Sequence, residues 1–166
     1  MKVFKASFQY PIGSIHIYSN NNQLLALSIN KENKLSMNNN EIIFSENEII
    51  YNTKNQLDLY FNGVLRKFNL PLYIEGTDKE KKVFNKLIEN VTFGSSISYS
   101  GLGDLSDIRN SARFVGNVLS KNQILIIIPC HRVIRKNGTL GGFNSEFIIK
   151  SKLFHFEKEL NHEVIH

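Results

Sequence analysis

One cysteine stands among residues that can activate a thiol. Cys130 is the only cysteine of the 166 residues, and His131 and Arg132 follow it directly. A free thiol has a pKa of about 8.5 and is mostly protonated at neutral pH, so a histidine base is the usual means of activating it. Glu157 falls on a predicted C-terminal helix, from which its carboxylate could orient His131. These residues predict a nucleophilic cysteine, although a lone cysteine is more often a small buried hydrophobic residue.

The segment before Cys130 predicts how the thiol reaches the surface. Residues 124–128 are five consecutive large aliphatic residues, which is typical of a short buried strand. Pro129 lacks a backbone N–H and favours an extended conformation in the residue before it, so we expect the strand to end there. Cys130 would then lie at the mouth of the hydrophobic core, with His131 beside it.

The first half of the chain predicts a small sheet. Three short segments rich in β-formers and separated by turn signals predict an antiparallel meander: residues 3–8, 14–19 and 24–29. Residues 31–40 are polar and predict a loop, and residues 41–51 fit either a strand or a helix. Residues 55–61 predict a short helix that ends at Asn62-Gly63. The turn at residues 75–77 marks the expected domain boundary.

The second half predicts helices. The first runs from a cap at Thr77 or Asp78 to about Asn90. Residues 99–105 are a weaker helix candidate, because glycines at 101 and 103 each cost about 1 kcal/mol relative to alanine. A third helix is expected over residues 108–120, and a last amphipathic helix over 147–160. The pair at 99–120 fits a helix-turn-helix with Arg113 near the start of its second helix, although most such pairs are merely packed helices.

The charge balance is basic and uneven. The chain has 20 Lys and Arg against 15 Asp and Glu, a net charge of +5. Residues 1–77 carry seven basic and six acidic side chains, and residues 78–166 carry thirteen and nine. A basic surface favours polyanions such as DNA, although it is more often simply solvated. The absence of a long apolar run, of a signal-peptide pattern and of further cysteines predicts a soluble intracellular protein without disulfides or a multi-cysteine zinc site.

Five motifs in one order resemble those of the O6-alkylguanine-DNA alkyltransferases, or methylated-DNA–protein-cysteine methyltransferases. They are Phe93-Gly94 with Tyr99-Ser100, the segment Ser111-Ala112-Arg113-Phe114-Val115-Gly116, Asn122, Pro129-Cys130-His131-Arg132-Val133 and Gly141-Gly142-Phe143. The resemblance covers residues 76–160 and implies an α+β fold. An N-terminal α/β domain (1–76) with a small antiparallel sheet, ribonuclease H-like, would precede a mostly helical C-terminal domain (77–166) containing the helix-turn-helix.

The resemblance also implies a reaction. Cys130 would take the alkyl group of O6-alkylguanine in DNA, irreversibly and once per molecule, with O4-alkylthymine as a second candidate substrate. His131, through a water molecule and polarised by Glu157, would accept the thiol proton. Asn122 would hold the turn that aims the thiol. Tyr99 would hydrogen-bond the flipped nucleotide as negative charge develops on it.

Further residues would bind DNA and the base. Arg113 would fill the gap that the extruded base leaves, and the predicted DNA contacts also include Tyr99, Ser111, Ala112 and Arg132. The base pocket would be lined by Val133, Gly141, Gly142, Phe143 and Asn144. In the pocket loop, Phe143-Asn144 replaces a common Tyr-Ser, which would narrow the tolerance for large alkyl groups.

The expected partner is double-stranded DNA that carries O6-alkylguanine. We expect a monomer in the cytoplasm, or in the nucleus of a eukaryote, without cofactor, metal or membrane association. A non-catalytic binder of alkylated bases that recruits other repair factors is the alternative, and retention of Cys130 argues against it. A cysteine hydrolase is a third interpretation, which repeated turnover would distinguish from a reagent that reacts once.

Overall fold

The computed structural model describes residues 1–140 and 145–164. The chain divides into two compact units. The first consists of Met1–Ile74 with Gln123–Leu125, and the second of Glu75–Asn122 with Ile126–His166. Nothing in the sequence indicates that residues 123–125 join the first unit. Within the described ranges, no helix has both the length and the apolar character that crossing a membrane requires.

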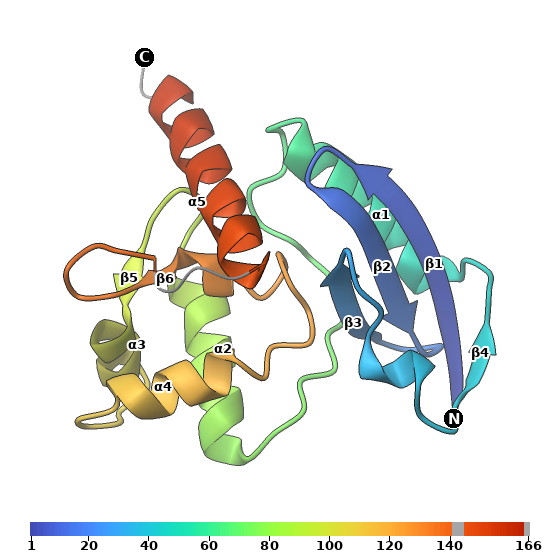
Figure 1. Ribbon diagram of the computed structural model, residues 1–166, viewed down its shortest axis with the longest axis horizontal. Helices are drawn as coiled ribbons and strands as arrows, with labels where there is room; N and C mark the ends of the chain where they lie inside the picture. The colour runs from blue at the N-terminus through green and yellow to red at the C-terminus, as the bar shows by residue number, and fades with distance from the viewer. Residues whose placement is uncertain (141–144, 165–166) are drawn as a thin grey trace. The chain divides into compact units, whose positions relative to one another are not determined.

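The first unit is built on a four-stranded sheet with the order β3-β2-β1-β4 (Figure 1). Strands β1 (Lys2–Tyr10), β2 (Gly13–Ser19) and β3 (Leu24–Ile29) form the predicted antiparallel meander, which is confirmed. Strand β4 (Glu41–Ile43) pairs with β1 in parallel. The ambiguous segment 41–51 therefore contains both kinds of structure, because helix α1 (Glu48–Phe61) begins five residues after β4 ends.

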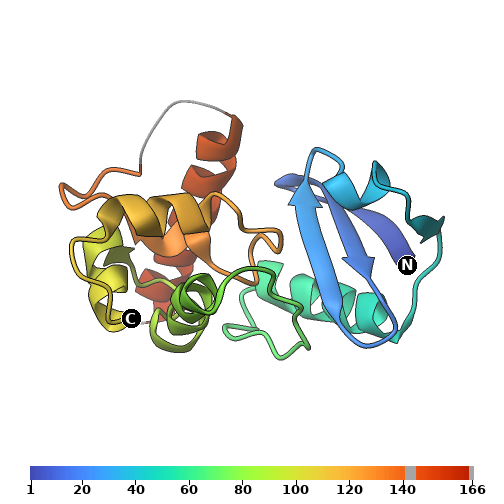
Figure 2. The ribbon, with the colours of Figure 1, turned by 90° about the horizontal axis from the view of Figure 1, so that it is seen from below.

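Both faces of this sheet are covered. Helix α1 runs along one face (Figures 1 and 2) and buries Ile50, Leu57 and Tyr60. On the other face, Tyr18 and Ala26 belong to a buried cluster against which Leu35 packs. Leu35 lies in the predicted loop, which contains the short 3₁₀ helix η1 (Lys34–Ser36). Coverage on both sides explains why β3 is buried along its whole length rather than alternating.

Residues 123–125 attach to the edge strand β3. The Leu27 N–H donates to the Gln123 carbonyl at 2.9 Å, and the Leu125 N–H donates to the Leu27 carbonyl at 3.1 Å. The Asn33 side chain donates to Oε1 of Gln123 at 2.7 Å. These bonds satisfy backbone groups that an edge strand would otherwise leave unpaired, and they hold the chain immediately before the segment that carries Cys130.

The second unit is mostly helical. In chain order its elements are α2 (Asp78–Asn90), β5 (Ile97–Ser98), α3 (Tyr99–Leu105), α4 (Ala112–Leu119), η2 (Cys130–Arg132), β6 (Val133–Ile134) and α5 (Ser145–Val164). Strands β5 and β6 form a short parallel pair. Helix α2 begins as predicted, with a capping box in which Thr77 and Glu80 each satisfy a backbone N–H of the other. Helix α3 has the bounds that the sequence predicted.

Two predicted elements differ from the structure. The helix expected from residue 108 begins only at Ala112, because Asp107 and Asn110 have left-handed φ angles of 59° and 47° that interrupt a helix. Residues 124–128 do not form a strand: Ile124 makes one isolated bridge with Leu27, and Ile126 turns the chain with a φ of 70°. The aliphatic run is apolar because it is buried in a turn, which periodicity does not distinguish from a strand.

Candidate active site

A tight turn presents Cys130. The Cys130 N–H donates to the Ile128 carbonyl at 2.8 Å across Pro129, whose φ of −83° and ψ of 61° are those of an inverse γ-turn. The chain then enters η2, where the Arg132 N–H donates to the Pro129 carbonyl at 2.9 Å. Ile128 and His131 are buried, whereas Cys130 is partly exposed. Cys130 therefore lies at the end of a buried segment, and a turn delivers it in place of the predicted strand.

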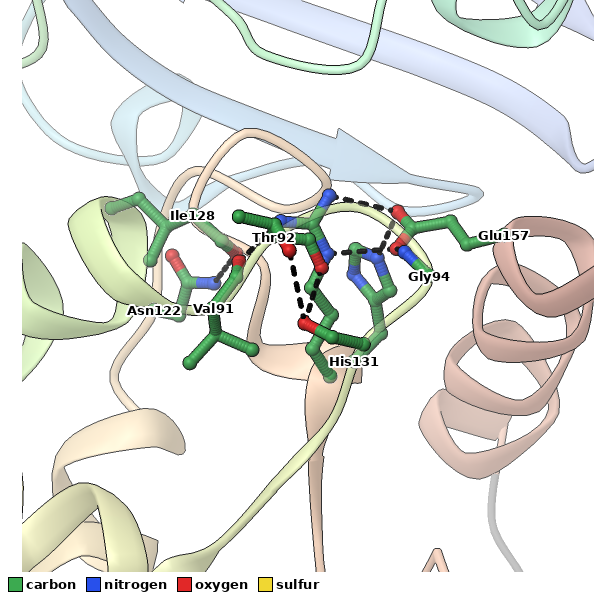
Figure 3. Close-up of polar contacts among 9 residues, drawn as sticks. Val91, Thr92, Gly94, Asn122, Ile128, His131 and Glu157 are labelled. Carbon is green, nitrogen blue, oxygen red and sulfur yellow. Dashed lines mark hydrogen bonds and ion pairs between the residues drawn. The ribbon is translucent and has the colours of Figure 1, made fainter. Parts of the chain in front are cut away.

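Asn122 stabilises this turn through two hydrogen bonds. It follows α4, and its Nδ2 donates to the Ile128 carbonyl at 3.0 Å (Figure 3) and to the sulfur of Cys130 at 3.2 Å. An amide NH₂ has two hydrogens, so both bonds can form together. One fixes the backbone before the cysteine, and the other contacts the sulfur directly. The arrangement fits the role that the resemblance implies for Asn122.

His131 pairs with Glu157 in the interior. Their Nε2 and Oε2 atoms lie 2.6 Å apart, and each side chain is only 2% exposed (Figure 3). Glu157 reaches His131 from the C-terminal helix α5, as the sequence predicted. Burial lowers the pKa of His131, although the Glu157 hydrogen bond opposes this effect. The imidazole is therefore neutral at pH 7, with its proton on the Nε2 that faces the carboxylate.

That proton assignment leaves Nδ1 as the ring nitrogen that can accept a proton. His131 Nδ1 is buried and has no hydrogen-bond partner among the residues that the structure describes. Burial also raises the pKa of the neighbouring Cys130 thiol, and the hydrogen bond from Asn122 only partly offsets this. The resting thiol is protonated, so it needs a base to react, and the unpaired Nδ1 of the adjacent residue can supply one.

Arg132 completes the network around Glu157. Its Nε donates to Oε1 of Glu157 at 2.7 Å and its Nη2 to Oε2 at 3.1 Å, while Nη1 donates to the Val91 carbonyl at 2.8 Å. The Gly94 N–H adds a bond of 3.3 Å to Glu157 Oε1. Although burial alone would raise the pKa of Glu157, the hydrogen bonds from His131 and Arg132 and the positive charge of Arg132 lower it well below its usual range. Glu157 is thus an anion held by several donors.

The predicted contact between Arg132 and DNA needs correction. Arg132 is only 7% exposed and its guanidinium is engaged by Glu157 and Val91, so it is not available to a phosphate. The sequence placed Arg132 beside the cysteine but did not reveal these partners. The sequence analysis named Gly94 only as part of a motif. The structure shows why a glycine is needed there, because its φ is 78° and Asn161 of α5 approaches it closely.

The helix pair α3–α4, with the N-cap residue of α4, carries the other residues predicted to contact DNA. Arg113 and Ala112 are exposed in the first turn of α4. Ser111 is only 3% exposed, and a Cβ added to Gly103 would lie 1.7 Å from its hydroxyl. Gly103 therefore permits close packing of the two helices, and the buried Ser111 side chain is not placed for the predicted DNA contact.

Tyr99 and Val133 take different positions in this unit. Tyr99 is the first residue of α3, half-buried, and its hydroxyl accepts a hydrogen bond of 3.2 Å from Lys150 Nζ of α5. Val133 is fully buried in β6, where it pairs with Ile97. The other predicted pocket residues lie outside the described residues: Gly141, Gly142, Phe143 and Asn144.

Comparison with known proteins matches both units. A family model described as the ribonuclease-like domain of 6-O-methylguanine DNA methyltransferase matches residues 3–74, and one described as the DNA binding domain of the same protein matches residues 78–159. The chain is 34% identical over 160 residues to a methylated-DNA–protein-cysteine methyltransferase of Methanosarcina acetivorans, covering 93% of this chain and 98% of the relative. A constitutive Bacillus subtilis protein of that name is 32% identical, over 89% of this chain and 91% of its own.

Solved structures agree with the sequence matches. The crystal structure of Mycobacterium tuberculosis O6-methylguanine methyltransferase superposes with a TM-score of 0.83 at 28% identity, covering 95% of this chain and 93% of its own. A crystal structure of Mycobacterium tuberculosis OGT in complex with DNA gives the same TM-score and identity, over 96% and 94%. The predicted α+β architecture is confirmed.

Proposed function

Because the chain belongs to the family of the methylated-DNA–protein-cysteine methyltransferases, we propose that it repairs DNA by moving the methyl group of O6-methylguanine irreversibly to Cys130. The observation that carries this proposal is the arrangement of three side chains around one turn. Asn122 contacts the sulfur, and His131, adjacent to Cys130, is held by Glu157. A hydrolase would use a similar pair, but the family relationship favours transfer to the cysteine itself.

Activation begins with the proton of the thiol. His131 Nδ1 takes this proton through one water molecule, and Glu157 stabilises the imidazolium that forms. The thiolate then attacks the methyl carbon as the bond from that carbon to the guanine oxygen breaks, with the electron pair remaining on the base. The product is a thioether, which offers water no good leaving group. Each molecule therefore reacts once.

The DNA must present the base outside the duplex. A methyl group on the guanine oxygen cannot be reached inside the stack, so the nucleotide is flipped, at a cost of a few kcal/mol that is smallest where pairing is already weakened. We place Arg113 in the gap that remains, since it is exposed in the first turn of α4 with Ala112 beside it. Tyr99 donates a hydrogen bond to the flipped base. The excess positive charge of residues 78–166 supports phosphate contacts.

The proposal extends to the setting of the reaction. The substrate is double-stranded DNA that carries O6-alkylguanine, with O4-alkylthymine as a further candidate. The protein acts as a monomer in the cytoplasm, or in the nucleus if the cell is eukaryotic.

Intact mass after incubation with duplex DNA containing O6-methylguanine tests the proposal. We expect one added methylene per protein, on the peptide that contains Cys130, and no second equivalent of repaired DNA. The Cys130→Ser variant should bind the DNA but leave the methyl group in place. Binding without any transfer by the unaltered protein would support the non-catalytic alternative, and repeated turnover would support a hydrolase.

A further inference from the structure

Residues 122–128 form a closed loop that leads into the turn carrying Cys130. The base of the loop is the hydrogen bond of 3.0 Å from Asn122 Nδ2 to the Ile128 carbonyl (Figure 3). Between these ends, Ile126 is buried and has a φ of 70°, a left-handed conformation that is strained for a β-branched residue. Such a conformation persists only where the surrounding structure imposes it, so contacts on the two sides of Ile126 must hold it.

Gln123 provides contacts on the N-terminal side of Ile126. Its backbone carbonyl accepts from the Leu27 N–H at 2.9 Å, and its Oε1 accepts from Asn33 Nδ2 at 2.7 Å. The Leu125 N–H donates back to the Leu27 carbonyl at 3.1 Å. The side chain of Asn33 is itself fixed, because its Oδ1 caps the 3₁₀ helix η1. The backbone before Ile126 is therefore bound to strand β3, and the Gln123 side chain is bound to the cap of η1.

We propose that Gln123 is a positioning residue for alkyl transfer, because its hydrogen bonds keep Ile126 left-handed and thereby keep Cys130 at the Asn122 side chain. This inference rests on the proposed function. Without these bonds, Ile126 can relax to an ordinary negative φ, which redirects the backbone just before Ile128. The Ile128 carbonyl and the Cys130 sulfur contact the same Asn122 Nδ2, at 3.0 and 3.2 Å. A change that displaces the carbonyl therefore displaces the thiol as well.

The contact with Asn122 also matters for the reactivity of the sulfur. Burial raises the pKa of the Cys130 thiol, and the hydrogen bond from Asn122 opposes this most strongly. The charges of Lys150 and Glu146 act on the thiol in opposite directions, and both belong to helix α5 and not to the loop. Loosening the loop would remove the Asn122 bond and leave these charges in place, so the thiol would lose its proton less readily.

Single-turnover transfer from O6-methylguanine duplex DNA to the full protein tests this role. Gln123→Met removes the acceptor for Asn33 and should slow transfer at saturating protein by about 10-fold, less than the roughly 10²-fold that a full misplacement can cost, because the Leu27 bonds remain. Gln123→Glu keeps an acceptor oxygen and should recover most of the rate. Gln56→Met is the matched control, since the Gln56 amide makes two bonds of 2.8 and 2.9 Å to the backbone of Asn69, outside the loop. Its rate should be unchanged.

Further readouts separate positioning from simple stabilisation of the fold. Ile126→Gly removes the backbone strain, because glycine adopts a positive φ readily, so Gln123→Met should slow transfer less in that background. In an Asn122→Ala background, Gln123→Met should have little further effect, because the side chain through which the loop acts is gone. The pH profile for alkylation of Cys130 by iodoacetamide, without DNA, should move to higher pH in Gln123→Met.

The outcomes distinguish this inference from the proposed function. Transfer at the unaltered rate by Gln123→Met, a loss of equal size with and without the Asn122 side chain, or an unchanged iodoacetamide profile would overturn the positioning role. The Asn122→Ala comparison decides this even where Ile126→Gly does not fold. Failure of the unaltered protein to accept any methyl group would instead overturn the proposed function, and the iodoacetamide profiles would still report on the loop.

Discussion

Each unit of the molecule has a glutamate at the centre of a polar network, and the two networks differ in what they leave free. Glu32 of the first unit accepts hydrogen bonds from Lys5, Tyr18 and Ser36. Glu157 of the second unit accepts them from Arg132 and Gly94 and pairs with His131. In both, the donors lower the pKa of the carboxyl, that of Glu32 to about 2. The side chain of Glu32 is 43% exposed, and that of Glu157 is 2% exposed.

The comparison shows that a paired carboxylate does not by itself identify a reactive site. The hydroxyl of Tyr18 donates to Glu32 and also accepts from the Asn33 N–H at 3.1 Å, so both its donor and its acceptor roles are used within the first network. In the second network, His131 keeps one ring nitrogen without a partner among the described residues, next to the only cysteine of the chain. We infer that the network around Glu32 stabilises the fold, whereas the network around Glu157 also orients a base.

The largest difference between the networks should appear in Glu157→Gln and Glu32→Gln. The amide NH₂ of glutamine can donate to His131 Nε2, which moves the imidazole proton to Nδ1 and removes the base. We expect methyl transfer to fall by about 10²- to 10⁴-fold, the range found when a catalytic histidine loses its base role or its tautomer. Glu32→Gln should transfer at the unaltered rate. Equal rates for both variants in single-turnover assays would contradict the assignment of His131.

The cations of the two networks should differ in their effect on stability. Arg132→Met leaves Glu157 buried without its bidentate partner, which costs about 3–5 kcal/mol of unfolding free energy. Lys5→Met leaves Glu32 in contact with water, so we expect a loss of about 1 kcal/mol or less. Urea unfolding of the two variants measures this difference. Comparable losses would show that exposure of the carboxylate does not separate the networks.

Acid should weaken the two units over different pH ranges. The folded pKa of His131 lies below its unfolded value of 6.5, so the unfolded chain binds a proton first and stability falls as the pH drops below 6.5. The pKa of Glu32 falls from 4.5 to about 2 on folding, so its contribution is present above pH 4.5 and is lost between those values.

Urea midpoints measured against pH distinguish the two groups. His131→Gln should flatten the curve just below pH 6.5, and Glu32→Gln should make it less steep between pH 4.5 and 2. A His131→Gln curve that keeps the full slope below pH 6.5 would mean that the imidazole is not held neutral in the folded protein.

The sequence predicted the residues of the site better than their surroundings. Residue types and a predicted helix suggested that Glu157 could orient His131, and the structure brings these two side chains together. The partners of Arg132 could not be found in this way, because the Val91 carbonyl is a backbone group that leaves no mark in the sequence. An arginine beside a cysteine was therefore predicted to contact DNA, although it is buried.

Helices and strands were predicted correctly where cap or turn residues mark their ends in the sequence. Helix α2 was predicted because Thr77 or Asp78 can cap a helix with one apolar face, and the meander because turn residues separate its strands. The strand prediction for residues 124–128 was wrong because the aliphatic residues there are buried in a turn and do not pair as a strand. Its turn depends on a left-handed φ angle at Ile126, which a β-branched residue rarely adopts and which the sequence therefore did not suggest.

The smallest expected effect concerns the Tyr18 hydroxyl, and it separates the networks most sharply. Tyr18→Phe removes a bond of 2.7 Å to Glu32 and leaves the rest of the first network in place. We expect a loss of about 1 kcal/mol in unfolding free energy, typical of one hydrogen bond, and no change in methyl transfer. The matched variant Tyr99→Phe should do the reverse, slowing transfer with little change in stability, because we propose that its half-buried hydroxyl donates a hydrogen bond to the flipped base. Parallel urea unfolding and single-turnover assays test both. If Tyr18→Phe slowed transfer, the network around Glu32 would have a part in the reaction, and the division between a stabilising and a reactive glutamate would not hold.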